Sequence, residues 1–329
     1  MPAPAQVVTV LAVTNRQPSP DAGFGARRST QGLSYERYRI SVPPQRQSAE
    51  IRYAGAKPDP AVNYIVLSRE RLGKGEFLEA AQQGIPPDGT LGLFVHGYNQ
   101  SYQEALFRSA QVQADSGMNT AILFSWPSEA SVLGYLADRD ASLASRSDLA
   151  EIIEALALLD GTRRLAVAGH SMGAFLLMET LRQLKLQGNE EVLRRVGVIL
   201  AAPDIDVEVF YAQMQTIGTM PLRMHILVSR NDRALAISRM LGSDRQRVGM
   251  VDVNDPRLAE LAARFGVTVL DITSVPTPDR FAHDGFATMA QFARRLTLSR
   301  PNGSTSAADI GLFVFDASQT LLAVPASVQ

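Results

Sequence analysis

The chain has no cysteine among its 329 residues. That absence excludes disulfide bonds, thiolate nucleophiles and cysteine-ligated metal sites, and it leaves the redox compartment undetermined. Long apolar runs are lacking too, so the sequence predicts no membrane-spanning segment. Neither sign of charge dominates: the formal net charge is −1, and no basic stripe with interleaved aromatic residues occurs. Nucleic acid is therefore not an expected partner.

A secretory signal is also lacking at the start of the sequence. Residues 1–5 contain neither a basic segment nor a long apolar one. Because a chain that begins after a removed signal would look the same, the location is left open between cytoplasm and periplasm or secretion. The apolar content of 46% is ordinary for a soluble globular enzyme and predicts no oligomeric state.

Short apolar runs alternate with helical patterns along most of the chain. Apolar runs without polar alternation are typical of strands buried on both faces of a parallel sheet. We therefore expect an α/β fold with a mostly parallel central sheet flanked by helices. The expected strands are 7–13, 91–95, 121–124, 165–168, 196–201, 226–228 and 267–270, with weaker antiparallel ones at 36–42, 50–54 and 63–67. The expected helices are 101–115, one capped by Ser147, 174–187 before Gly188, 207–217, 256–265 before Gly266, and 286–296.

The last thirty residues differ in character from the rest. Residues 301–306 are typical of a flexible linker, and 310–315 and 320–324 could form a hairpin. The expected organisation is one domain over 1–300, followed by a C-terminal tail over 301–329.

Residues 169–173 read Gly-His-Ser-Met-Gly, a G-x-S-x-G pattern between an apolar run and a helical pattern. A serine hydroxyl becomes a nucleophile when a tight strand-to-helix turn exposes it beside a base and an anion-stabilising pocket. Glycines two positions on either side of Ser171 leave room for such a turn. This context predicts a nucleophile elbow at Ser171 rather than an ordinary glycine-rich turn.

A serine nucleophile needs a general base, and the chain offers only four histidines. His170 neighbours the serine, and we expect its side chain to point away from it. His225 begins an apolar strand and is interpreted as structural, while His96 is expected to shape the loop after a buried strand. His283 follows the last core strand, at the carboxyl edge of the sheet, where ligands bind in α/β folds. We therefore predict His283 as the base.

The acid that orients the base should follow another strand, between the serine and the histidine in the chain. Asp232 follows the expected strand 226–228 and is the preferred candidate. Asp204 and Asp206 follow the preceding strand and are the alternatives. Asp204 could instead cap the helix expected at 207–217.

Two backbone N–H groups are expected to stabilise the oxyanion that forms during acyl transfer. One is the N–H of Met172, directly after the serine. The other is the N–H of Tyr98, in the loop after the expected strand 91–95. Gly97 lets this loop approach a substrate closely, and the Tyr98 and Asn99 side chains are candidates for further contacts.

The remaining candidates concern the substrate pocket. Its predicted residues are His96, Gly97, Asn99, Trp126 and His170. Trp126, the sole tryptophan, could wall the pocket or simply pack in the core. Residues 127–146 could form a small flap. The stretch 203–222 has room for one helix, so we expect no large lid domain.

Six short motifs occur along the chain in a fixed order. They are Val13-Thr14-Asn15-Arg16, Phe94-Val95-His96-Gly97-Tyr98-Asn99, Phe124-Ser125-Trp126-Pro127-Ser128, Gly169-His170-Ser171-Met172-Gly173, Ala202-Pro203-Asp204-Ile205-Asp206 and Ser229-Arg230-Asn231-Asp232-Arg233-Ala234-Leu235. Together they resemble a bacterial α/β-hydrolase family catalogued as a domain of unknown function, with esterase- and lipase-like members. The resemblance spans about residues 7–297. It implies an α/β-hydrolase fold and serine-ester chemistry, and it fixes no substrate.

The predicted function is hydrolysis of small-molecule carboxylic esters through an acyl-enzyme, with Ser171, Asp232 and His283 as the triad. This chemistry needs no metal and no organic cofactor. One alternative is that the same triad acts on thioesters or passes the acyl group to another acceptor. A second is a non-catalytic binding or surface protein on a hydrolase scaffold. A third, weaker one is a calcium site made by Asp138, Asp140, Asp204 and Asp206.

Overall fold

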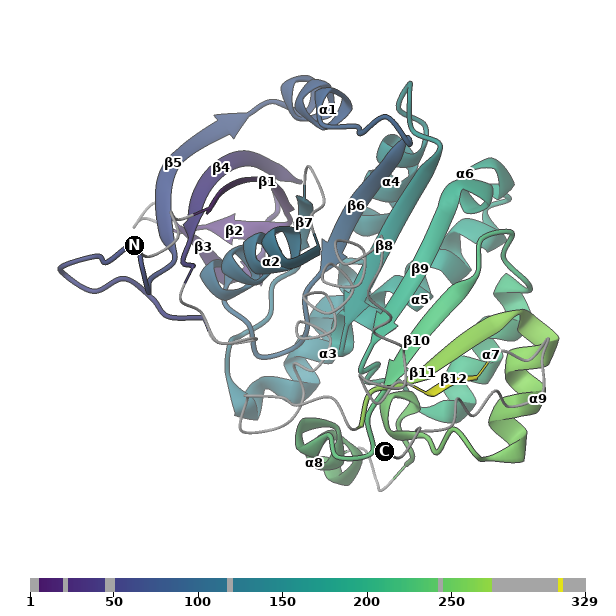
Figure 1. Ribbon diagram of the computed structural model, residues 1–329. Helices are drawn as coiled ribbons and strands as arrows, with labels where there is room; N and C mark the ends of the chain where they lie inside the picture. The colour runs from purple at the N-terminus through teal and green to yellow at the C-terminus, as the bar shows by residue number, and fades with distance from the viewer. Residues whose placement is uncertain are drawn as a thin grey trace, which may run out of the picture.

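The computed structural model describes residues 6–19, 23–44, 51–116, 121–241, 245–273 and 313–315. Within them lies a ten-stranded sheet with the order β12-β11-β10-β9-β8-β6-β7-β1-β4-β5 (Figure 1). Its strands are β1 (Gln6–Thr14), β4 (Ser34–Val42), β5 (Ile65–Leu72), β6 (Thr90–Val95), β7 (Ala121–Ser125), β8 (Arg164–His170), β9 (Val196–Ala201), β10 (Met224–Val228), β11 (Val267–Asp271) and β12 (Phe313–Phe315). A separate hairpin pairs β2 (Arg16–Pro18) with β3 (Phe24–Arg28).

The sheet is parallel from β1 to β11 and antiparallel at both edges. The strands β1, β7, β6, β8, β9, β10 and β11 pair in parallel, whereas β4 and β5 on one side and β12 on the other pair antiparallel. The predicted mostly parallel α/β sheet is therefore confirmed, as are its antiparallel strands near 36–42 and 63–67.

Helices cover both faces of the sheet. They are α1 (Lys74–Gln83), α2 (Tyr102–Ser116), α3 (Tyr135–Ala144), α4 (Arg146–Ala157), α5 (Met172–Leu186), α6 (Glu190–Arg195), α7 (Val207–Ile217), α8 (Arg233–Leu241) and α9 (Pro256–Phe265), with short 3-10 turns at Val132–Gly134 and Val248–Met250. In β1, Val10 packs with the apolar side of α2, while Leu11 packs in the core with α4 and α5. This alternation explains why the strands are apolar throughout.

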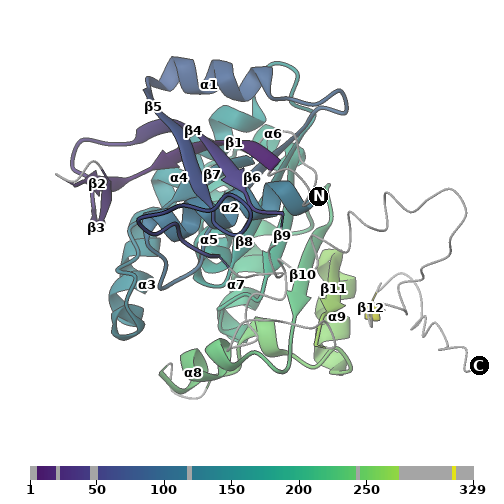
Figure 2. The same ribbon diagram turned by 60° about the vertical axis from the view of Figure 1, so that its left-hand side comes forward.

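The two ends of the molecule carry different helices. In both views, α1 and α6 lie at one end of the strands, and α3 and α8 lie at the other (Figures 1 and 2). The second end is the carboxyl edge of the parallel strands, where the chain leaves β6 toward α2 and leaves β8 toward α5. Ligand sites of α/β sheets lie at this edge.

Several predicted helix ends are confirmed. Ser101 and Glu104 form the capping box of α2: each backbone N–H donates to the other side chain, at 2.7 and 3.2 Å. Gly188 and Gly266 follow α5 and α9 with φ of +77° and +66°. The stretch between β9 and β10 holds α7 alone, in agreement with the expected absence of a large lid there.

One predicted cap, at Ser147, and one alternative interpretation, of Asp204 as a cap, are wrong. Ser147 lies inside α4, because the helix starts one residue after Ser145, whose hydroxyl donates to the Ala141 carbonyl of α3. Asp206, not Asp204, caps α7, since its Oδ1 accepts from the first turn of the helix at 3.0 and 3.2 Å. In both cases two residues of capping type lie two positions apart, and the contacts of each in the folded structure decide which one lies at the start of the helix.

Some expected elements differ from the structure. Residues 51–54 form no strand, and only a single bridge joins Tyr53 to Tyr64. Residues 127–146, expected as a flap, contain a 3-10 turn and the helix α3. Of the expected tail hairpin, only β12 is described, and it extends the main sheet beside β11. The expected helix 286–296 and the rest of the tail lie outside the described residues.

Among the described helices, none has both the length and the apolar character needed to cross a bilayer.

Candidate active site

Ser171 is the single residue between the end of β8 and the start of α5. Its backbone has φ 53° and ψ −120°, an unfavourable conformation for a residue with a side chain. Such a residue costs about 1–3 kcal/mol and persists only where its surroundings hold it. Its N–H donates to the Ala201 carbonyl at 2.9 Å, and its carbonyl accepts from the N–H groups of Ala174 and Asp204 at 3.0 and 3.2 Å. The strained turn is thus held by β9, α5 and the loop after β9.

The two glycines of the pattern allow close approach of backbone segments. A Cβ atom at Gly173 would lie 2.2 Å from the His96 carbonyl oxygen and 2.5 Å from that of Val95. At Gly169 it would lie 2.8 Å from the Ala174 Cα. The first turn of α5 therefore packs directly on the end of β6, which sets the distance between the elbow and the loop after β6.

Gly97 brings that loop against the serine. A Cβ atom there would lie 2.9 Å from His170 Nδ1 and 3.1 Å from Ser171 Cβ. Only glycine fits this contact without displacing the elbow. Tyr98 and Asn99, which follow it, lie beside Ser171 at one cavity.

The cavity has a volume of about 380 Å³ and contains Ser171 in its wall. The predicted residues Tyr98, Asn99 and His170 line it as well. Met172 is buried at the N-terminal end of α5, where the helix dipole and the free N–H groups of the first turn favour an anion. The structure thus brings together the serine, the loop after β6 and the start of α5, as the sequence predicts.

The cavity lining is part polar and part apolar. Gln100, Glu104 and Arg108 line it at and just before the start of α2. Ala234, Leu235 and Ile237 of α8 form an apolar part of the wall together with Val132, and the same helix also places Ser238 there, hydrogen-bonded to Asp204. A ligand with one polar and one apolar part matches this mixed lining.

His96 and Trp126, predicted as pocket residues, lie beneath the loop instead. Both are fully buried, and neither lines the cavity within the part of the chain that the structure describes. Their rings stack at 5.0 Å, and Trp126 Nε1 donates to the His96 carbonyl at 2.8 Å. Burial, with a smaller contribution from nearby Arg16, lowers the pKa of His96 to about 3, so the ring is neutral at pH 7. The sequence could not choose between wall and core for Trp126, and the structure places it in the core.

The two remaining histidines are His225 and His283. His225 lies near the amino end of β10, away from the carboxyl edge, and burial followed by Arg223 lowers its pKa. This placement fits its structural interpretation. His283 lies outside the described residues, so its role as the base stays a prediction.

The candidate acids have different partners. Asp204 lines the cavity, and its Oδ1 accepts from Ser238 Oγ and lies 3.2 Å from Nε of Arg247, a fully buried ion pair. Asp206 caps α7. Asp232 is buried after β10, and its Oδ1 accepts from the Leu235 N–H at 2.9 Å.

Three of the residues named for a calcium site, Asp138, Asp204 and Asp206, are engaged with protein groups. Asp138 is fully buried and accepts from the N–H groups of Asn99 and Glu129 and from Ser128 Oγ. Nowhere in the described ranges do three or more histidine or acidic side chains cluster in a way suited to a metal ion.

Comparison with known proteins gives a family match. A family model described as "Alpha/beta hydrolase of unknown function (DUF900)" matches residues 82–300. A search of curated proteins found no match. Among solved structures, Est1E from Butyrivibrio proteoclasticus is 11% identical with a TM-score of 0.39, covering 66% of this chain and 90% of that one. Esterase Est22 is 13% identical with a TM-score of 0.42, covering 90% and 80% respectively. At these scores the two structures carry no argument about the chemistry.

Proposed function

The chain belongs to the alpha/beta-hydrolase family of unknown function, and from this premise we propose that it is a serine hydrolase that cleaves carboxylic esters through an acyl-enzyme. One observation carries the proposal: Ser171 holds a strained backbone conformation at a strand-to-helix junction, in the wall of a cavity and at the N-terminal end of α5. Strain of this kind concentrates at functional sites, and this arrangement is the one that activates serine in α/β hydrolases.

In the proposed reaction, Ser171 Oγ attacks the ester carbonyl carbon while its proton passes to His283. The N–H groups of Met172 and Tyr98 stabilise the oxyanion of the tetrahedral intermediate. The intermediate collapses, the carbon–oxygen bond to the alcohol breaks, and His283 returns the proton to the departing alcohol. Water then attacks the acyl-enzyme by the same route and releases the acid and the free serine.

Asp232 is the proposed partner of His283. The partner of one alternative supports this choice: the Asp204 carboxylate already balances the buried charge of Arg247, whereas Asp206 and Asp232 each accept from the first turn of the helix that follows. Removing Asp204 from its pair would leave a buried cation uncompensated, which is costly. Asp232 follows β10, two strands from the elbow in the sheet, where an orienting acid is expected.

The proposal is tested by labelling with a fluorophosphonate and mapping the modified residue. We expect a single label on Ser171, loss of that label in Ser171→Ala, and loss of ester hydrolysis by a factor of about 10³ or more. Ser109→Ala is a matched control, because Ser109 is a fully buried serine on α2 that does not line the cavity. It should keep both label and activity. Full ester hydrolysis by Ser171→Ala would refute the proposed nucleophile.

A further inference from the structure

A buried arginine holds the loop that carries Tyr98. Arg16 follows β1, is 1% exposed, and donates to four groups on three segments. Its guanidinium contacts Ser125 Oγ at 3.0 Å, the Gly25 and Ser128 carbonyls at 3.1 and 3.0 Å, and the Gln100 carbonyl at 2.9 Å. The forked geometry of arginine allows one side chain to hold all of these acceptors.

Asp138 also holds this loop. This carboxylate, fully buried on α3, accepts from the Asn99 N–H at 3.1 Å and also from Ser128 Oγ. Burial lowers the pKa of Arg16 to about 10, and attraction to Asp138 counteracts part of that decrease. Arg16 is therefore charged at neutral pH, and Asp138 is the acidic group that most offsets its charge.

Consecutive backbone groups after Tyr98 are thereby fixed by side chains. The Asn99 N–H is bound by Asp138, the Gln100 N–H by Ser128 Oγ at 3.1 Å, and the Gln100 carbonyl by Arg16. Asn99 itself has φ +56°, a kink that these bonds maintain. The loop can therefore hold a fixed path where it passes Ser171.

We propose that Arg16 and Asp138 are positioning residues for the oxyanion loop, holding the Tyr98 N–H where the oxyanion develops. This inference rests on the proposed serine-hydrolase function. Neither residue touches substrate: Arg16 and Asp138 act through the backbone of residues 98–100. Fixed donors stabilise the transition state because they need no reorganisation during the reaction.

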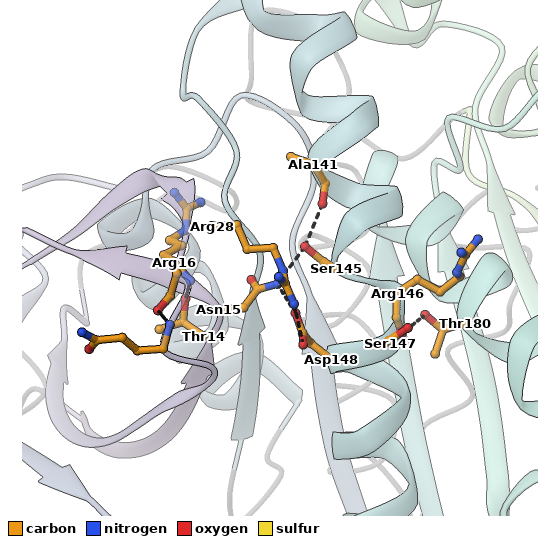
Figure 3. A network of polar contacts seen from close by, with 12 residues as sticks. Thr14, Asn15, Arg16, Arg28, Ala141, Ser145, Arg146, Ser147, Asp148 and Thr180 are labelled. Atoms are coloured by element: carbon orange, nitrogen blue, oxygen red, sulfur yellow. Dashed lines mark hydrogen bonds and ion pairs between the residues drawn. The ribbon is translucent and has the colours of Figure 1, made fainter.

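The neighbouring residue Asn15 holds a different part of the structure. Its Nδ2 donates to Ser145 Oγ at 2.9 Å and to Asp148 Oδ2 at 2.7 Å, and Arg28 pairs with the same carboxylate at 2.8 Å (Figure 3). These interactions join the end of β1 to the junction of α3 and α4, and none of them involves a residue of the loop 96–100. Asp148→Asn therefore disturbs a comparable polar network without reaching that loop.

The test compares Asp138→Asn with Asp148→Asn in the full chain. An amide at position 138 keeps only one acceptor oxygen, so its NH₂ group faces either the Glu129 N–H or the Asn99 N–H and Ser128 Oγ, and the loop loosens. We expect kcat to fall about 10- to 100-fold, with KM changed less than about threefold, because ground-state binding does not use the oxyanion donors. Affinity for a boronic acid, which forms a tetrahedral adduct with serine, should fall in parallel with kcat. Asp148→Asn should keep kcat within about twofold even where its melting temperature falls.

Equal kcat values in the two variants, at equal folded fraction, would overturn the inference. Should Asp138→Asn not fold, Ser128→Ala decides, since it removes the acceptor of the Gln100 N–H, a donor to Asp138 and a long, local bond from the Ala130 N–H. A lower kcat and weaker boronic acid binding in Ser128→Ala support the inference, and wild-type values for both refute it. Fluorophosphonate labelling of wild-type Ser171 separates the two proposals: a missing label refutes the hydrolase function, whereas a label with unaffected variants refutes only the positioning role.

Discussion

Replacing Gly97 by alanine tests the contact between the elbow and the loop after β6. The added methyl group would lie 2.9 Å from His170 Nδ1 and 3.1 Å from Ser171 Cβ. Favourable contacts between such atoms need about 3.5 Å, so the loop or the elbow must move by roughly 0.5 Å. Side chains hold the backbone of residues 99 and 100 through hydrogen bonds. The displacement therefore changes the distance and angle between the Tyr98 N–H and the serine.

A misplacement of about 1 Å costs about 10²-fold in rate, so about half that displacement corresponds to about 10-fold, or about 1.4 kcal/mol of transition-state stabilisation. We expect the kcat/KM of Gly97→Ala for a p-nitrophenyl ester to fall by about that factor. Overpacking should lower the free energy of unfolding by about 1–3 kcal/mol, measured by urea denaturation.

Gly75→Ala is the matched control. Gly75 lies exposed in α1, and a Cβ atom there meets nothing within 4 Å. This variant should keep wild-type activity and gain about 0.5–1 kcal/mol of stability from the helix propensity of alanine. An activity of Gly97→Ala within about threefold of the wild type would refute the close-contact argument, because the loop would then accept the methyl group without displacing the donor.

The remaining predictions concern pH and substrate size. Activity should fall on acidification below about pH 6.5, the ordinary pKa of histidine, as His283 takes up a proton, and a flat rate profile from pH 8 to 5 would contradict the proposed base. Stability should show a separate pH dependence from His96, whose pKa is lowered by burial to about 3 in the folded state. As pH falls, the unfolded chain binds the proton first, so the contribution of His96 to the free energy of unfolding is complete above about pH 6.5. It is lost as pH falls toward 3, by up to about 1.4 kcal/mol per pH unit. A pH series of urea unfolding, with His96→Gln as the comparison, measures this slope, and an equal slope in both proteins would refute the prediction. The apolar wall at α8 should raise kcat/KM up to about fourfold for each added acyl methylene until the cavity is filled, since a buried methylene contributes about 0.8 kcal/mol. Ala234→Trp, which fills that wall, should abolish this gain for butyrate over acetate esters, and an unchanged ratio would place the acyl chain elsewhere.

Local patterns in the sequence are sufficient for the parallel sheet and the elbow. The close contacts that require glycine at 169 and 173 are made with residues 173–174 and with the end of β6. The pattern and its position between a strand and a helix are therefore enough to identify the turn. The prediction of His283 as the base, chosen among the four histidines, also needs only the sequence, because the carboxyl edge of a parallel sheet can be inferred from the order of its elements.

Contacts between distant segments are not predictable in the same way. Arg16 reaches Gln100 and Ser128, 84 and 112 residues away, and nothing in the local pattern around Arg16 indicates these partners. The only signal was its presence in the Thr14-Asn15-Arg16 segment, one of the motifs behind the family resemblance. The choice between wall and core for Trp126 likewise depends on the stacking with His96, which follows from how β6 and β7 pair.

Buried charged side chains hold two segments that lie next to the strained serine. Arg16 and Asp138 hold the loop after β6, while Arg247 pairs with Asp204, whose backbone N–H donates to the Ser171 carbonyl. Buried ion pairs add little net stability, because desolvation offsets most of their attraction. A stability role alone therefore gives a weak reason for placing these buried charges beside one turn. The hydrogen bonds of Arg16 and Asp138 to the loop that faces the elbow, and of the Asp204 N–H to the elbow itself, give a stronger reason. An unfavourable conformation such as that of Ser171 persists only where its neighbours over-determine it.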